Sequence, residues 1–339
     1  MKSAKFAINL DLETISVCIA AERVLLFSDE EPFEELPTSA KNSVDWGEVV
    51  KFSIRENSKT RKSHIDIRYL LSRAESILLK KNPHNLPSST STLLNLSKAF
   101  TIVQDLPTAR NFKICTRWGV HEKLHDWETS FLTVAKWLSH FEQFQQLPIE
   151  FRMKFLSGIW HLWVTFDKLS MNYLARQRGI TDERVFLAGK DVYVDSNNIK
   201  LDFSWMTDYE KDSLTLFTDT IDWNMLTFIK PLLELNPNHV ELTFMISQLC
   251  FNYAGLRFQS PILEISERFQ EILANDLHNY YINHEKLPRY SARLAQLMKF
   301  VRTIEENFRD KKWKVEVGET FGVWKLDFSH PEVFKDNFC

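Results

Sequence analysis

WETSFLTVAKWLSHFEQFQQLPIEFRMKFLSGIWHLWVTFDKL, residues 127–169, contains two long apolar stretches on either side of one short break before Pro148. Apolar residues recur at helical spacing in both stretches, and tryptophans fall on the faces expected to point inward. No residue pattern in this run carries catalytic chemistry. We therefore interpret it as two packed helices that form the core of a binding domain.

The composition indicates an intracellular globular protein without a strong overall charge. Of 339 residues, 44% are apolar and 13% aromatic, which is enough to bury a large core. The 42 basic and 45 acidic residues nearly cancel, so no broad positive field draws the chain to nucleic acid or an anionic membrane. The four cysteines are too far apart for a paired ligand motif, and no apolar run is long enough to span a membrane. We expect no direct binding to nucleic acid or membrane, and no metal or other cofactor.

The pattern of the chain changes near residue 60. Residues 1–60 include an acidic stretch with two prolines and a polar run, so we interpret them as a partly disordered extension or linker. Residues 61–339 are predicted to form one helical domain, in which the helix around Trp160 is buried on all sides. Helices are expected over residues 67–78, 92–104, 128–146, 148–177, 208–218, 220–234, 237–255, 260–283 and 288–312, with a short one at the C-terminus.

One segment breaks the helical pattern. Apolar residues at 192–194 and, in alternation with Lys200, at 199–201 flank the turn-forming cluster of residues 195–198. This pattern predicts one small β-hairpin in an otherwise all-α domain.

Seven short blocks, taken in order, resemble the ligand-binding domain of nuclear hormone receptors, and in particular its divergent nematode branch. They are residues 134–138, 144–148, 160–163, 241–245, 277–281, 290–294 and 328–332, and the resemblance extends from about residue 61 to the end. It implies a three-layer antiparallel helical sandwich with an apolar pocket and a terminal helix that closes a coactivator groove. The zinc fingers of such receptors are each held by four cysteines, and the four scattered cysteines of this chain cannot build them.

The terminal segment is predicted to be a two-state element. Ser329 and Glu332 have capping-box spacing, and Val333, Phe334 and Phe338 form an apolar stripe. A helix this short is marginal in water, so it must dock to be populated, and its docking can respond to what fills the pocket. The alternative is a terminal helix that simply completes the core. On the switch interpretation, Phe334→Ala weakens peptide recruitment with little loss of stability.

The resemblance also implies which residues bind a coactivator helix. Asp336 takes the place of the acidic residue of the terminal helix, and Lys154 substitutes for the basic residue usually found at the positions of Ser139 and Ser157. The expected groove residues are Ala135, Ser139, Met153, Lys154, Ser157, Val333, Phe334, Asp336 and Phe338.

For the ligand pocket, the same resemblance points Ser130, Val134, Trp160, Val164 and Met171 inward. Met171 falls where acid-binding members of the family place an arginine, and a buried carboxylate without that arginine would lack its paired charge. We therefore expect a neutral lipophilic ligand, or an interior that the tryptophans fill themselves.

The helix beginning near Pro288 carries a stripe that can serve a dimer. Leu294, Leu297, Val301 and Ile304 recur every three or four residues, as in a coiled-coil seam. The resembled family dimerises through this helix, so the stripe predicts a homodimer or a heterodimer with other receptors. A core-facing helix needs the same stripe, so both interpretations stay open.

The run His121-Glu122-Lys123-Leu124-His125 matches H-E-x-x-H, in which two histidines bind zinc and the glutamate activates water. Its flanks are polar and no third ligand is close in sequence, so a zinc metallopeptidase is only a remote alternative and we do not expect an enzyme. The preferred interpretation is a ligand-responsive transcriptional regulator that acts through protein partners in the nucleus, with the cytoplasm as a second location. The main alternative is a ligand-independent dimerisation domain that titrates intact receptors.

Overall fold

The computed structural model describes residues 49–56, 61–80, 91–104, 106, 113–189, 192–214, 216–217 and 223–334. They all belong to one unit that extends from Trp46 to Cys339. Its helices are α2 (Arg68–Leu79), α3 (Thr92–Gln104), α4 (Val120–Leu138), α5 (Glu142–Gln145), α6 (Ile149–Gln177), α7 (Lys211–Leu214), α8 (Trp223–Leu235), α9 (His239–Phe258), α10 (Ile262–Asn283), α11 (Ser291–Thr320) and α12 (Pro331–Phe334). Its strands are β1 (Lys51–Glu56), β2 (Arg61–Asp66), β3 (Lys113–Cys115), β4 (Arg117–Trp118), β5 (Val185–Gly189), β6 (Val192–Asp195), β7 (Lys200–Leu201) and β8 (Leu326–Phe328).

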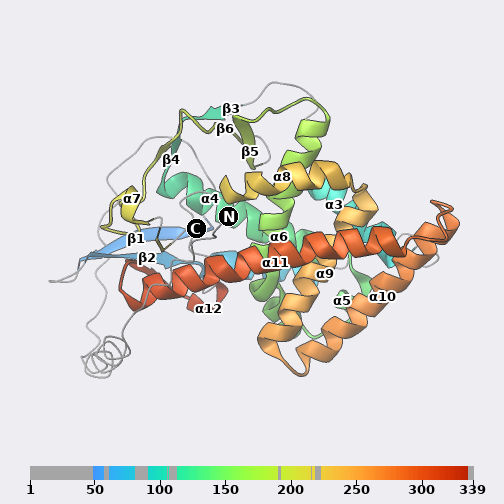
Figure 1. The fold of residues 1–339 in the computed structure, drawn as a ribbon. Helices are drawn as coiled ribbons and strands as arrows, with labels where there is room; N and C mark the ends of the chain where they lie inside the picture. The colour runs from blue at the N-terminus through green and yellow to red at the C-terminus, as the bar shows by residue number, and fades with distance from the viewer. Residues whose placement is uncertain are drawn as a thin grey trace, which may run out of the picture. The chain divides into compact units, whose positions relative to one another are not determined.

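The helices pack as a layered sandwich, which confirms the predicted fold class. In the middle, α6 packs against α9; α4 covers α6 on one side, and α10 and α11 cover α9 on the other. Figure 1 shows α11 crossing the front of this arrangement, with α6 and α9 behind it. Residues 241–251 of α9 are all buried, as a helix with neighbours on every side requires. Among the described residues, no helix combines the length and apolar character needed to cross a bilayer.

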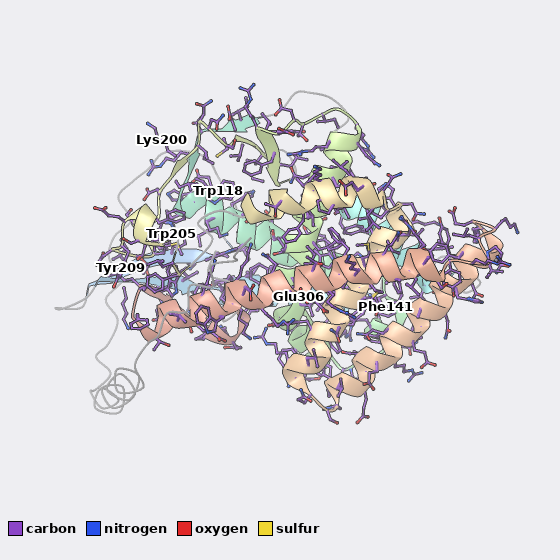
Figure 2. The ribbon with its side chains drawn as sticks, viewed as in Figure 1. Trp118, Phe141, Lys200, Trp205, Tyr209 and Glu306 are labelled. Atoms are coloured by element: carbon purple, nitrogen blue, oxygen red, sulfur yellow. The ribbon has the colours of Figure 1, made fainter. Side chains whose placement is uncertain are left out.

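Aromatic side chains fill the interior between these helices. Trp127, Trp137, Trp160 and Trp163 are each at most 1% exposed, so the quoted stretch does point its tryptophans inward. The break between α4 and α6 is also part of the core, because Phe141 lies against Phe269 with ring centroids 4.5 Å apart. Figure 2 labels Phe141 at the end of the domain formed by α5, α9 and α10. The sequence break therefore turns the chain without opening the core.

The small β elements pair differently from the prediction. Asp195 does build the expected turn, because its carboxylate accepts the Asn197 N–H at 2.9 Å and the Asn198 side-chain amide at 2.6 Å. However, β6 pairs antiparallel with β5 and parallel with β3, while β7 pairs parallel with β4. Because β3 and β5 occupy both edges of β6, the residues after the turn pair elsewhere, and the predicted hairpin between residues 192–194 and 199–201 does not form.

A second sheet, which the sequence did not predict, joins the two ends of the described chain. Its order is β1-β2-β8, with β1 antiparallel and β8 parallel to β2. The hairpin brings residues 51–56 into the folded unit, so the unit begins before residue 61. Residues 1–48 lie outside the described part of the chain. In Figure 1 the blue strands β1 and β2 lie beside the red segment that leads to α12.

At the end of β2, Asp66 connects this sheet to α2. Its carboxylate accepts the Arg68 N–H at 3.0 Å and pairs with the Arg68 guanidinium at 2.6 Å. These hydrogen bonds to Arg68, with a smaller one to Ser329, outweigh the cost of burial and lower the pKa of Asp66 from 3.8 to about 2.

Asp66→Asn should make the protein less sensitive to acid. Because the folded pKa is depressed, the charged form stabilises the fold above pH 3.8, and this stabilisation is lost as pH falls toward about 2. We expect urea midpoints to fall more steeply over this window in the parent than in Asp66→Asn. Equal slopes in the two proteins would show that the Asp66 contacts do not contribute.

A buried ion pair connects the middle layer to the outer helices. Arg293 of α11 donates to Glu241 of α9 at 2.8 and 2.7 Å, and the Tyr281 hydroxyl of α10 donates to the same carboxylate at 2.7 Å. Burial alone would raise the pKa of Glu241, but the donors Arg293, Tyr281 and the Asn238 N–H outweigh it and hold that pKa below its ordinary value. Three helices therefore share one charged junction.

Candidate functional site

The described part of α12 is a short turn whose apolar side chains lie in the core. Phe334 is 0% and Val333 3% exposed. The Phe334 ring lies 4.9 Å from Trp127, 5.2 Å from Trp160 and 4.5 Å from Phe328, with which it is stacked. The Phe334 ring is thus enclosed by one aromatic side chain from each of α4, α6 and β8.

Polar contacts hold the backbone of α12 as well. The Trp160 indole N–H donates to the Val333 carbonyl at 2.9 Å. Arg257, at the end of α9, donates to the Glu332 carbonyl at 3.1 Å and to the Gly158 carbonyl at 3.3 Å. A cation next to the last carbonyls of a helix satisfies acceptors that have no partner within the helix. Arg257 therefore ties α12 to α6.

Beside Arg257 lies a basic surface with an aromatic centre. The Phe258 ring has the Lys154 ammonium 4.9 Å from its centroid and the Arg257 guanidinium at 5.1 Å. Gly158 permits this packing, because a Cβ there would come within 2.4 Å of the Phe258 ring. Leu256, two residues before Phe258, is 62% exposed on α9. We call Lys154, Arg257 and Phe258 the basic rim.

Comparison with known proteins identifies the family. The family model described as the ligand-binding domain of nuclear hormone receptor matches residues 108–321. This chain belongs to the nuclear hormone receptor family. Nuclear hormone receptor family member nhr-130 of Caenorhabditis elegans is 37% identical over 82% of this chain and 64% of its own length. Family member nhr-103 of the same organism is 33% identical over 99% of this chain and 80% of its own length. Family member nhr-115 is 40% identical over 68% of this chain and 59% of its own length. The chain thus spans less than two thirds of nhr-130 and of nhr-115.

Nuclear hormone receptors are non-enzymatic transcription regulators, so membership of this family argues against a zinc metallopeptidase built on the H-E-x-x-H run. Glu122 of that motif has a structural role, since its carboxylate accepts the Gly119 N–H at 2.9 Å and so caps the start of α4. His121 and His125 are exposed on the same helix. The described residues contain no group of three or more His, Cys, Asp or Glu placed to hold a metal ion. The glutamate is therefore explained by helix capping.

The expected groove residues of this receptor domain divide by exposure. Lys154 is exposed, and Met153 and Ser157 are half-buried on the same helix. Ala135 and Ser139 are buried at the end of α4, where the Ser139 hydroxyl donates to the Lys136 carbonyl at 2.7 Å. Val333 and Phe334 lie in the core, not on a groove surface, and Asp336 and Phe338 lie outside the described residues.

The expected pocket residues do not all come together. Val134 and Trp160 belong to the main core, with Val164 packed at its margin. Ser130 is half-buried and donates to Asp126 at 3.5 Å. Met171 belongs to a separate cluster with Ala175, Leu187 and Tyr193, beneath β5 and β6. The Trp160 ring is itself covered by Phe131 at 5.7 Å and by Phe334.

The stripe on α11 that suggested a dimer seam is used within the chain. Leu297, Val301 and Ile304 are at most 3% exposed and belong to the main core, and Leu294 packs against it. They face α9 and α8, so the dimer interface predicted at these residues does not fit this packing. The same periodicity serves a core-facing helix, and only the neighbours of α11 decide between the two uses.

Several residues around α12 were missed in the sequence. Trp205 comes from the loop after β7 and contacts Trp127, and Arg257 carries no motif. Phe328 falls in the block 328–332 but received no contact role there. Trp127 lies in the quoted stretch, but nothing there indicates that its ring contacts Phe334. Lys136, exposed in the last turn of α4, is a further basic residue that received no role.

Proposed function

We propose that this receptor domain regulates transcription in the nucleus by binding an amphipathic helix of a coregulator at the basic rim, with α12 already docked before any ligand binds. The observation that carries the proposal is the aromatic enclosure of Phe334, together with the Trp160 hydrogen bond to Val333. All the groups that make these contacts belong to this chain. Docking of α12 therefore does not require a ligand to complete its seat.

The chemistry of the basic rim supports a helical partner with an acidic end. Lys154 and Arg257 place two cations against the half-buried Phe258 ring, so an apolar stripe with acidic residues next to it would complement the surface. Met153 and Ser157, on the same helix as Lys154, would extend the contact. In this proposal the two cations orient the partner helix, while Asp336, expected to bind that helix as the acidic group of the terminal segment, lies outside the described residues.

Lys154→Glu should weaken binding of such a peptide about tenfold, since it replaces an attraction with a repulsion. The probe is a fluorescently labelled helical peptide with apolar residues at i, i+3 and i+4 and acidic residues at one end, measured by anisotropy. Lys299→Glu, an exposed charge reversal on α11, is the matched control and should bind like the parent. If the parent binds no peptide of this pattern, or both variants bind equally, the proposal is wrong.

Binding of a neutral lipophilic ligand is the second candidate function, and the uncharged side chain of Met171 favours it. Its thioether offers no positive charge to a carboxylate, and it lies 4% exposed among apolar side chains. Native mass spectrometry of the purified protein tests this directly. A co-purified neutral lipid would support it, and the same spectrum reports whether the chain forms a dimer through a surface other than the α11 stripe.

A further inference from the structure

We propose that the β1–β2 hairpin is a clasp that holds α12 in its docked position, so that opening the hairpin regulates peptide binding at the basic rim. The regulatory part rests on the proposed function; the mechanical part does not. The inference begins with the size of α12. Its described turn, Pro331–Phe334, is too short to be helical on its own, so its position depends on what holds the chain before it.

The segment before α12 is held by strand pairing with the hairpin. In β8, Leu326, Asp327 and Phe328 pair with Ser63, His64 and Ile65 of β2. The Ser63 N–H donates to the Lys325 carbonyl at 2.8 Å, and the Ser329 N–H donates to the Ile65 carbonyl at 3.0 Å. Beyond the strand, the Ile67 N–H donates to the Ser329 hydroxyl at 3.0 Å. The backbone contacts of β2 thus continue to within two residues of Pro331.

Aromatic contacts also connect the sheet to α12. Phe328 of β8 stacks on Phe334 with an interplanar angle of 8°. From the other strand, Phe52 of β1 packs edge-on against Trp205 at 6.0 Å, Trp205 contacts Trp127 at 6.1 Å, and Trp127 contacts Phe334. Figure 2 shows Trp205 beside the hairpin, on the side of the domain where α12 lies. The Phe334 ring is therefore supported directly by β8 and, through Trp205 and Trp127, by β1 of the hairpin.

A second set of contacts anchors the chain just before β8 to the loop after β7. The Lys325 N–H donates to the Met206 carbonyl at 2.8 Å, and the Thr207 hydroxyl donates to the Val323 carbonyl at 2.8 Å. The Ser63 hydroxyl in turn donates to the Trp205 carbonyl, so this loop is bound to β2 as well. These contacts end at Lys325. From Leu326 onward the strand partner of the segment is β2, and release of β2 would leave α12 attached by its own side chains, Trp160 and Arg257.

The strand geometry provides a variant that opens the clasp and a matched control in the same hairpin. The Ser63 N–H points to β8, so Ser63→Pro removes a donor to the terminal segment. Alternation along the strands points the N–H of His64 to the carbonyl of Ser53 and the N–H of Ser53 to the carbonyl of His64, and it points the Ile54 N–H to the outer edge of the sheet. Ile54→Pro therefore places a proline at an edge position that tolerates it.

Hydrogen–deuterium exchange of the full chain tests the mechanical part. We expect Ser63→Pro to speed exchange across residues 326–334 about tenfold or more over the parent, with α9 unchanged and Ile54→Pro close to the parent. If exchange at 326–334 stays as slow as in Ile54→Pro, the clasp is wrong. If Ser63→Pro also loses protection in α9, Ser329→Ala replaces it, because it removes the acceptor of the Ile67 N–H and the hydroxyl contacts with Asp66 and His330 while it keeps every backbone group of the sheet. Unchanged exchange in Ser329→Ala would then overturn the proposal.

Anisotropy with the acidic helical peptide tests the regulatory part on the same proteins. Faster exchange at α12 with about tenfold weaker peptide binding supports both the clasp and its role. Faster exchange with unaltered binding retains the clasp but overturns its regulatory role. A parent that binds no peptide, with faster exchange in Ser63→Pro, overturns the proposed function and leaves the clasp standing.

Discussion

Phe334→Ala is expected to lower the free energy of unfolding by about 3–5 kcal/mol, the range for removing a fully buried aromatic ring. The ring is 0% exposed and contacts Trp127, Trp160 and Phe328, so alanine would leave a cavity lined by three rigid aromatics that cannot easily collapse. This reverses the result expected from the switch interpretation of the sequence, in which Phe334 contributes mainly to the groove. Urea unfolding followed by tryptophan fluorescence measures it.

Phe321→Ala is the matched control for that measurement. Phe321 is 48% exposed at the end of α11, so the same atoms are deleted from a site that is already partly hydrated. We expect a loss of less than about 1 kcal/mol there. A loss of similar size in the two variants would mean that α12 is not docked in solution as it is in the structure, and the proposal of ligand-independent docking would fall with it.

Arg293→Ala is the second substitution with a large expected effect, about 3–5 kcal/mol, because it leaves the Glu241 carboxylate buried without its partner. The Glu241 side chain is 4% and that of Arg293 23% exposed, so water cannot easily replace the lost hydrogen bonds. Arg293 also donates to the Leu235 carbonyl at 2.6 Å, which extends the damage to the end of α8. Chemical denaturation at neutral pH is the measurement.

Arg117→Ala serves as the control for this ion pair. Arg117 pairs with Asp202 at 2.7 Å, but its side chain is 70% exposed, so its loss should change stability far less than that of Arg293. Comparable losses in the two variants would show that burial of the Glu241 pair adds nothing.

The same ion pair predicts a pH dependence with a definite sign. The folded pKa of Glu241 is depressed, so the stabilisation is present above the ordinary glutamate pKa and is lost as pH falls through the lower folded value. Glu241→Gln should therefore be less stable than the parent at neutral pH, and the gap should narrow in acid. If the stability difference between the parent and Glu241→Gln stays constant with pH, it arises from the shape of the side chain and not from its charge.

Much of the helical architecture could be predicted from the sequence, because most long helices have apolar residues at helical spacing within their own residues. The predicted span 92–104 coincides with α3, and the spans 148–177 and 260–283 lie within two residues of α6 and α10. The start of α4 was predicted wrongly. This helix begins at Val120, eight residues before the predicted start, and it includes the H-E-x-x-H run, with Glu122 as its cap. The periodic apolar signal is weak in that first turn, so pattern reading starts the helix too late.

The candidate site was only partly accessible from the sequence. Lys154, Met153 and Ser157 could be chosen because they follow one another on a helix that the sequence predicts. Arg257 and Trp205 could not, because each lies far from α12 in the sequence and neither belongs to a motif. Phe328 falls in the block 328–332, but nothing in that block indicates that its ring stacks on Phe334. The α11 stripe shows the limit most clearly, since identical spacing serves a dimer seam or a core face.

The helical class, the buried tryptophan core and the resemblance to receptor domains could all be predicted from residue patterns, because periodicity and local motifs are properties of short neighbouring segments. The inward-facing stripe of α11, the pairing of β8 with β2 and the burial of Phe334 became known only from the packed fold. Those outcomes depend on which surfaces meet across more than 250 residues of chain, as in the pairing of Ser63 with Leu326. Apolar side chains bury themselves against any suitable neighbour, and the sequence does not state which neighbour that will be.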